Sequence, residues 1–449
     1  MSQSDKAAAV PSSRLARLAR LGSLASGVAG GMLAEGVRQW SRGNRPSVGD
    51  LLLTPGNAQR VADQLSRLRG AAMKVGQLLS MDAGDLMPPE LAAILARLRA
   101  DAQAMPMSQL VPVLEAAWGA GWDRHFERFS FTPLAAASIG QVHAAQLKSG
   151  ERLAIKVQYP GVRQSIASDV DNVATLLRVS GLLPRTLDFA PLLEEAKRQL
   201  HDEADYLKEA AYLEAYRGRL ADHGDFALPT VHRALTTPDI LAMSFMDGLP
   251  IESLAAAPQD ERDRVLGLLF ELLFREIFEF RCVQTDPNFA NYRYDEASGR
   301  LVLLDFGATR HFSAGCIEAY SRLLRAGQCG DLESLSAAAI EIGYFQADIA
   351  PDHQRQVLDI FQTACEPLRH EGPYDFGSST LARRIRDVGL RLGRDRNFWH
   401  TPPVDALFLH RKIGGLYLLA ARLKARVDIR AIFLRHVVPP TVPPGEGNA

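Results

Sequence analysis

QTDPNFANYRYDEASGRLVLLDFGATR, residues 284–310, carries the strongest structural signal in this 449-residue chain. An Asp-Pro dipeptide stands near its start, the strand-forming YRY follows, the chain reverses at Ser298-Gly299, and the apolar LVLL leads to Asp305. This order predicts a loop, a strand, a turn, a second strand and a second loop. The acidic residues Asp286 and Asp305 therefore stand in loops on either side of a β-hairpin.

The spacing of polar residues in this stretch matches phosphoryl-transfer chemistry. Protein kinases place a catalytic-loop Asp five positions before a metal-binding Asn, and a DFG Asp follows on the next hairpin. Here Asp286 precedes Asn291 by the same spacing, and Asp305 opens a DFG tripeptide. A DFG tripeptide alone is a weak signal, but together with the other two residues it is strong. The alternative for Asp286 and Asn291 is an ordinary turn, which both residue types favour.

Two further kinase-like features lie upstream. Lys156 ends Ala-Ile-Lys and matches the strand lysine that contacts the nucleotide phosphates and pairs with a helix Glu. The alternative is an edge lysine on an amphipathic strand. Where kinases place a Gly-rich loop, this chain has Ala135-Ala136-Ala137-Ser138. Alanine disfavours the positive φ that glycine permits, so we expect this backbone to approach phosphates differently.

Strand patterns occupy residues 129–160 around a turn at Gly150, and helical periodicity precedes and follows them. A long charged helix is predicted from about Pro191 to Leu220, and the chain after Arg310 is mainly helical to Phe433. We predict an α+β, two-lobed protein-kinase-like fold with an N-terminal helical extension. The predicted parts are a basic and apolar segment (1–50), the helical extension (51–125), an N-lobe with a helical insertion (126–247), a helical C-lobe (248–437) and a disordered tail (438–449).

Composition limits the classes of partner and compartment. With Lys+Arg 51 against Asp+Glu 52 the formal net charge is -1, which argues against a nucleic-acid partner. The 4 cysteines are widely spread, so we expect neither a zinc site nor disulfides. Residues 21–34 are apolar and follow several arginines, but they are too short for a membrane-spanning helix. Gly27 and Gly31 form a GxxxG pair, which suits either helix dimerisation in a membrane or ordinary packing.

Several segments resemble the UbiB family of atypical kinases, in its coenzyme Q branch. The resemblance runs from about Val10 to Phe433 and is closest in PSSRLARLARLGSLASG, RGAAMKVGQLLS, PLAAASIGQVH, QTDPNFANYRY, LLDFGATR and LHRKIGGLYLLAARLKAR. The chain departs from ordinary kinases in having Gln284-Thr285 in place of the His-Arg of H-R-D, and no A-P-E after DFG. It departs from many family members in having Ser244 where a Glu is common in the hinge.

The resemblance implies a role for each matching residue. The family's KxGQ motif matches Lys74, Gly76 and Gln77, and the helix that carries it is expected to block the groove in which a protein substrate would lie. The family's ExD motif matches Glu203 and Asp205, whose carboxylates are expected to meet that helix and the metal–nucleotide site. Glu209 is the expected partner of Lys156, and ATP and Mg²⁺ are the expected cofactors. The alternative for the carboxylates of Glu203, Asp205 and Glu209 is that they lie on the solvated face of a charged helix. The implied residues are Asp286, Lys156 and Glu209 for catalysis; Ala135, Ala136, Ala137, Ser138, Lys156, Met243, Ser244, Phe245 and Met246 for the nucleotide; Asn291 and Asp305 for the metal; and Lys74, Gly76, Gln77, Glu203 and Asp205 for occlusion.

By the same resemblance, the chain is expected to be a kinase-like ATPase that supports ubiquinone (coenzyme Q) biosynthesis. Expected partners are anionic lipid membranes, quinone-precursor lipids, ubiquinone-biosynthesis enzymes and a second copy of the chain. The expected location is the cytoplasm, peripherally on a bacterial-type inner membrane. Two alternatives remain: a nucleotide-binding scaffold of a biosynthetic complex, and a small-molecule phosphotransferase.

Overall fold

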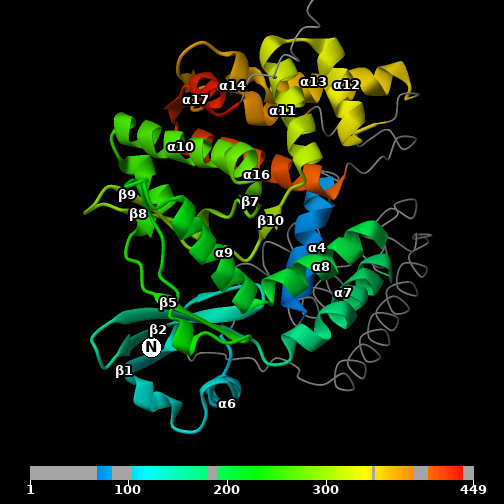
Figure 1. Cartoon of the computed structure of the whole chain (residues 1–449). Helices are drawn as coiled ribbons and strands as arrows, with labels where there is room; N and C mark the ends of the chain where they lie inside the picture. Colours follow the sequence, from blue (N-terminus) through cyan, green and yellow to red (C-terminus); the bar gives the residue numbers. More distant parts are fainter. Residues whose placement is uncertain are drawn as a thin grey trace, which may run out of the picture. The chain divides into compact units, whose positions relative to one another are not determined.

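The computed structural model describes residues 68–82, 104–179, 190–345, 349–385, 387 and 403–437. The chain divides into two compact units. Unit 1 consists of Met1–Asp247 and Leu303–Ala308, and unit 2 of Gly248–Val302 and Thr309–Ala449. Both contain helices and antiparallel strands, which confirms the predicted α+β class (Figure 1).

Unit 1 is built on an antiparallel sheet with the strand order β1-β2-β3-β5. The predicted hairpin is confirmed: Gly150 lies between β2 and β3 with a φ of 90°, which favours glycine. The strands are β1 (Phe126–Ala136), β2 (Gly140–Leu147), β3 (Arg152–Gln158) and β5 (Ile240–Ser244), and a short β4 (Phe226–Ala227) precedes β5.

The core of unit 1 explains how β3 presents its lysine. Leu153, Ile155 and Val157 alternate along β3 and are fully buried in one apolar cluster with Trp122 and Phe126. Because side chains alternate across a strand, Lys156 points to the opposite face of the sheet. Packing of the odd-numbered residues therefore fixes the direction of the Lys156 side chain.

The helices of unit 1 include the one that carries the predicted KxGQ motif. Figure 1 shows α4 beside α8, and α4 also contacts α7. The helices are α4 (Arg69–Asp82), α6 (Met107–Trp118), α7 (Val162–Val179), α8 (Ala190–Glu203) and α9 (Tyr206–Arg219), with 3-10 turns at Trp122–His125 and Arg233–Leu235.

The prediction of one continuous helix from about Pro191 to Leu220 is wrong, because α8 ends at Glu203 and α9 begins at Tyr206. The Ala204 carbonyl accepts hydrogen bonds from Gln158 Nε2 at 2.6 Å and from Arg163 Nη2. Asp205 then caps α9 by accepting from the backbone N–H of Lys208 at 3.1 Å. A side-chain cap and tertiary donors to a carbonyl are the usual means of ending one helix and starting another.

Unit 2 is mainly helical, as predicted for the chain after Arg310. In Figure 1 α10 runs beside α16, and it also packs against α17. Its helices are α10 (Gln259–Phe274), α11 (Ala314–Cys329), α12 (Leu332–Ile342), α13 (Pro351–Ala364), α14 (Glu366–Arg369), α16 (Val404–Arg422) and α17 (Ile429–His436), with a π-helical turn at Arg275–Glu279 and 3-10 turns at Ile251–Ala256 and Phe289–Asn291.

The strands of unit 2 are short, and two of them flank the Asp-Pro loop in the sequence. β7 pairs with β10, and the loop runs from the end of β7 to the start of β8. The predicted strand–turn–strand after this loop is confirmed by β8 and β9. The strands are β6 (Leu249–Pro250), β7 (Cys282–Gln284), β8 (Tyr292–Asp295), β9 (Arg300–Leu303), β10 (Thr309–His311), β11 (Tyr374–Asp375) and β12 (Arg426–Val427).

Some predictions concern residues that the structure does not describe. The structure does not describe the apolar N-terminal segment with Gly27 and Gly31 or the 438–449 tail. It also leaves out most of the 51–125 extension other than α4 and α6. Among the helices that are described, none combines the length and the apolar character that a bilayer crossing requires.

Candidate active site

Lys156 and Glu209 form a buried ion pair in unit 1. Lys156 stands in β3 between β2 and β5, opposite Val142 on one side and Leu241 on the other. Its Nζ donates to both Glu209 carboxylate oxygens at 2.9 Å. Both side chains are buried, Glu209 to the point of 2% exposure. The helix Glu expected as the partner of Lys156 is therefore in hydrogen-bond contact with it.

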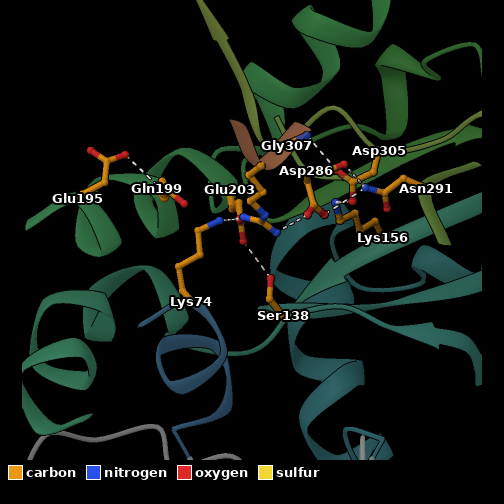
Figure 2. A network of polar contacts seen from close by, with 11 residues as sticks. Lys74, Ser138, Lys156, Glu195, Gln199, Glu203, Asp286, Asn291, Asp305 and Gly307 are labelled. Atoms are coloured by element: carbon orange, nitrogen blue, oxygen red, sulfur yellow. Dashed lines mark hydrogen bonds and ion pairs between the residues drawn. The ribbon is translucent and has the colours of Figure 1, made fainter. Parts of the chain in front are cut away.

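The same ammonium also reaches Asp305. Lys156 Nζ lies 3.4 Å from Asp305 Oδ2, and the backbone N–H of Gly307 donates to Asp305 Oδ1 at 2.9 Å (Figure 2). One cation is thus shared by two carboxylates that come from a helix and from the 303–308 segment. An ammonium carries three donors, so Lys156 would exchange one of these carboxylate contacts to meet a phosphate oxygen.

Electrostatics keep Lys156 and Asp305 charged. Burial by itself would lower the pKa of Lys156, but the charges of Asp305 and Glu209 raise this pKa well above its ordinary value. Burial also opposes ionisation of Asp305, yet Lys156 and the Gly307 N–H hold the pKa of that carboxyl below its usual range. Burial raises the pKa of Glu209 to about 7 against the attraction of Lys156. At neutral pH, Asp305 is therefore an anionic oxygen ligand beside a protonated lysine.

Helix α9 holds the Asp-Phe-Gly segment as well as Glu209. Tyr216 lies seven positions, or two helical turns, after Glu209 and so stands on the same face. Its ring centroid is 4.8 Å from that of Phe306, which is buried. A Cβ at Gly307 would lie 3.3 Å from both Asp305 Oδ1 and Glu209 Oε2. Glycine at this position therefore lets the two carboxylates approach the chain closely.

Lys74 of the KxGQ sequence forms an ion pair with Glu203, the first residue of the ExD sequence. Ser138 Oγ donates to the other oxygen of Glu203 at 2.9 Å (Figure 2). A Cβ at Gly70 would lie 2.8 Å from the Ser138 carbonyl oxygen. Helix α4 is therefore attached to the alanine-rich turn by a polar chain through Glu203 and by a close backbone approach at Gly70.

The remaining KxGQ and ExD residues are placed as follows. Gly76 is buried within α4, and Gln77 lies in the same helix, with its side chain outside the described part. Asp205 caps α9, as described above. Its expected approach to a metal–nucleotide site stays a prediction.

The alanine-rich segment is partly strand. Ala135 and Ala136 belong to β1 and pair with Val142 and Gln141, and Ala137 N–H donates to the Gly140 carbonyl at 2.8 Å. All of the segment is described, and the non-glycine residues with positive φ are elsewhere, at Arg281 and Lys424. The turn is thus tight and uses only conformations that alanine tolerates.

The predicted adenine hinge, Met243 to Met246, uses some of its backbone donors internally. Ser244 N–H donates to the Thr230 carbonyl and Phe245 N–H to the Arg152 carbonyl, both at 2.8 Å. These two donors are occupied, so an adenine contact would use other groups of the segment. Its role as a hinge stays a prediction.

In unit 2, Asp286 is held through both carboxylate oxygens. Asn291 Nδ2 donates to Asp286 Oδ2 at 3.1 Å (Figure 2). Arg411 Nη2 donates to Asp286 Oδ1 at 2.6 Å. Asn288 caps the intervening 3-10 turn by accepting from Ala290 N–H. The predicted pair Asp286 and Asn291 is thus in direct contact. Because the Asn291 amide nitrogen donates to Asp286, the amide oxygen is the atom that Asn291 offers to a cation.

Arg411 was not predicted from the sequence as a site residue. It lies on α16, 125 positions after Asp286, and only tertiary structure brings the two together. The available signal was the stretch LHRKIGG, which carries two adjacent basic residues between the apolar runs ALFL and LYLLAA. Buried basic residues within an apolar helix usually have a specific partner.

The chemistry of the predicted metal ligands fits Mg²⁺. Asp305 offers a carboxylate and Asn291 an amide oxygen, and Mg²⁺ bound with a nucleotide usually takes one or two carboxylates together with phosphate oxygens. In the described ranges there is no cluster of three or more His, Cys, Asp or Glu side chains that would hold a metal by protein ligands alone. Asp305 belongs to unit 1 and Asn291 to unit 2, and their joint use as metal ligands stays a prediction.

Comparison with known proteins gives consistent matches. Residues 97–339 match the model of the ABC1 atypical kinase-like domain. The chain is 37% identical over 431 residues to the mitochondrial atypical kinase COQ8 of Saccharomyces cerevisiae, covering 95% of this chain and 85% of the yeast protein. It is 37% identical over 426 residues to the mitochondrial atypical kinase COQ8B of Rattus norvegicus, covering 94% and 80% respectively.

Among solved structures, a Mycobacterium tuberculosis protein in complex with erythromycin matches with a TM-score of 0.57 at 24% identity. The match covers 85% of this chain and 96% of that one, and it supports the fold. Together with the match to the ABC1 atypical kinase-like domain, this confirms the predicted kinase-like fold.

Proposed function

We propose that this chain binds ATP with Mg²⁺ and hydrolyses the ATP in support of coenzyme Q biosynthesis. The chain belongs to the ABC1 family of atypical kinase-like enzymes. The observation that carries the proposal is the buried ammonium of Lys156, shared by Glu209 and Asp305. This lysine is buried, and its two carboxylates come from α9 and from the 303–308 segment. One of them opens the DFG sequence that holds metal in kinases.

Each residue of the constellation has a separate part. Glu209 orients the Lys156 ammonium toward the nucleotide phosphates. Asp286, fixed by Asn291 and Arg411, orients the attacking oxygen and accepts its proton. Asn291 and Asp305 are the proposed ligands of Mg²⁺, which when bound neutralises phosphate charge. Such positioning and charge neutralisation supply most of the catalysis in phosphoryl transfer.

Water is the proposed phosphate acceptor. The support comes from α4, whose Lys74 binds Glu203 and whose Gly70 approaches Ser138. With its KxGQ sequence fixed in this way, we propose that α4, including Gly76 and Gln77, occupies the groove that a protein substrate would need. A small acceptor such as water is then favoured.

The biological setting is proposed from the relatives. Two of them are named COQ8 and COQ8B, atypical kinases of mitochondria. We propose peripheral binding to an anionic membrane through the basic and apolar residues 1–50, with contact to quinone-precursor lipids and to biosynthetic enzymes. Basic side chains beside apolar ones suit such an interface. A homodimer and a bacterial-type inner membrane location belong to the same proposal.

The proposal is tested by following the label of γ-labelled ATP with the purified full chain. The reactions contain anionic liposomes, neutral liposomes or none. We expect the label in free phosphate, with faster release on the anionic surface. Transfer of the label to a soluble acceptor would favour a small-molecule phosphotransferase. Nucleotide binding without release under any condition would favour a scaffold.

A further inference from the structure

The loop that carries Asp286 is tied at both ends to one buried lysine of unit 2. Lys412 is 2% exposed. Its Nζ donates to Gln284 Oε1 at 3.2 Å and to the Tyr292 hydroxyl at 2.9 Å. Gln284 is the last residue of β7 and Tyr292 the first of β8, so the two contacts lie immediately before and after residues 285–291.

The charge of Lys412 is balanced by Glu276. Glu276 Oε2 lies 3.6 Å from Lys412 Nζ, and Glu276 Oε1 accepts the backbone N–H of Gln284 at 3.1 Å. Burial alone would lower the pKa of Lys412, but Glu276 and Tyr292 raise it. A buried charge persists only when paired and hydrogen-bonded, and both ends of this pair also hold Gln284.

Helix α16 contacts the same loop at two further places. Arg411 binds the Asp286 carboxylate, and a Cβ at Gly415 would lie 2.2 Å from the Cβ of Pro287. At the neighbouring Gly414 an added Cβ would meet nothing within 4 Å. The helix backbone thus lies directly against Pro287, and only glycine fits at that contact.

We propose that Lys412 is a positioning residue for the Asp286 loop, and that with Gly415 it replaces the support that ordinary kinases build beside the catalytic Asp. Those kinases carry His-Arg before this Asp, whereas Gln284 and Thr285 stand here. The support comes instead from α16, through the Lys412 contacts to Gln284 and Tyr292. This inference rests on the proposed function, because it assigns Lys412 to the reaction of Asp286.

The glycines of α16 provide a matched pair for the test. Gly415→Ala adds one methyl group against Pro287, and Gly414→Ala adds the same group in open space. A displacement of about 1 Å at a reacting group costs about a hundredfold in rate, so kcat for phosphate release should fall about this much in Gly415→Ala. ATP affinity, measured by fluorescent-nucleotide titration, should stay within about twofold of the wild-type value, because a contact that acts only in the transition state changes kcat and leaves substrate binding unchanged. Gly414→Ala should match wild type in both.

A second variant removes the charges without leaving one unpaired. Lys412→Met combined with Glu276→Gln should lower kcat and leave ATP affinity unchanged, and Arg422→Met on the exposed end of α16 is its control. Hydrogen–deuterium exchange of a peptide covering residues 285–291 should become faster in the double variant, while peptides from α10 and α17 keep wild-type exchange.

The outcomes separate the inference from the proposed function, because exchange needs no turnover. Faster exchange confined to residues 285–291 supports the inference even in a chain without phosphate release, which would refute only the proposed function. Unchanged exchange of this loop overturns the inference. Equal acceleration across α10, α17 and the loop also overturns it, since it would show a general structural role. A loosened loop with unchanged kcat in an active chain overturns it as well.

Discussion

Lys74 and Glu203 lie 129 positions apart in the sequence, and their side chains form an ion pair in which Lys74 is 5% exposed. The lysine comes from α4 and the carboxylate from the last residue of α8. Because Glu203 also accepts from Ser138, one carboxylate connects the helix to the turn between β1 and β2. Glu203 is therefore one of the contacts that position α4, together with the close approach of Gly70 to the Ser138 carbonyl.

Removal of the Glu203 carboxylate should destabilise unit 1. Glu203→Ala leaves the Lys74 ammonium buried without this partner, which typically costs about 3 kcal/mol or more. Urea unfolding followed by circular dichroism measures the change. Asp202→Ala, which removes a partly exposed ion pair with Lys208 near the same helix end, should cost at most about 1 kcal/mol. Equal losses in the two variants would show that burial does not strengthen the Lys74 pair.

Replacement of Lys156 should slow turnover strongly. Lys156→Met keeps the length of the side chain and removes the charge between Glu209 and Asp305. Loss of one preorganised electrostatic contact costs about 10²–10³ in kcat, which a phosphate-release assay measures. Lys208→Met removes a partly exposed lysine from α9 and should retain the wild-type rate. A Lys156→Met chain with wild-type kcat would exclude the proposed role of this ammonium.

The strand-bearing part of unit 1 could be predicted from the sequence, because its signals are local. The alternation of apolar residues in 152–158 and the glycine at 150 are sufficient to indicate β2, β3 and their turn. The break between α8 and α9 could not be predicted. It depends on Gln158 and Arg163, which reach the Ala204 carbonyl from elsewhere in the sequence.

In the candidate site, too, contacts within one loop could be predicted from the sequence, whereas contacts between distant segments could not. The Asp286–Asn291 contact follows from a spacing of five residues, which one loop can satisfy. The pairing of Lys156 with Glu209 was expected only from the family resemblance, because no local pattern connects β3 to α9. Arg411 and Lys412 were missed, since their partners in and beside the Asp286 loop lie at least 120 positions away.

The stability of unit 2 should depend on pH through His410. Its ring stacks on Tyr344 at a centroid distance of 5.2 Å and hydrogen-bonds to the Tyr344 hydroxyl. Burial lowers the pKa of His410 to about 4. The folded state therefore binds a proton less readily than the unfolded state. The contribution is fully present above the ordinary histidine pKa of about 6.5 and is lost as the pH falls from there toward 4.

The size of this effect follows from linkage. Between about pH 6.5 and pH 5 the wild-type chain should lose about 2 kcal/mol of unfolding free energy through this group. Urea unfolding at several pH values, compared between wild type and His410→Gln, isolates the contribution. A pH dependence that is the same in both chains would show that His410 is protonated equally in the folded and unfolded states.

The central claim is that Asp305 and Lys156 belong to a working nucleotide site. The most direct measurement is Mg²⁺-dependent phosphate release by the purified full chain, compared among wild type, Asp305→Asn and Asp352→Asn. Asp352 is an exposed carboxylate of α13 and serves as the control. We expect release that requires Mg²⁺, that persists in Asp352→Asn and that is lost in Asp305→Asn. Release at the wild-type rate in Asp305→Asn would contradict the account.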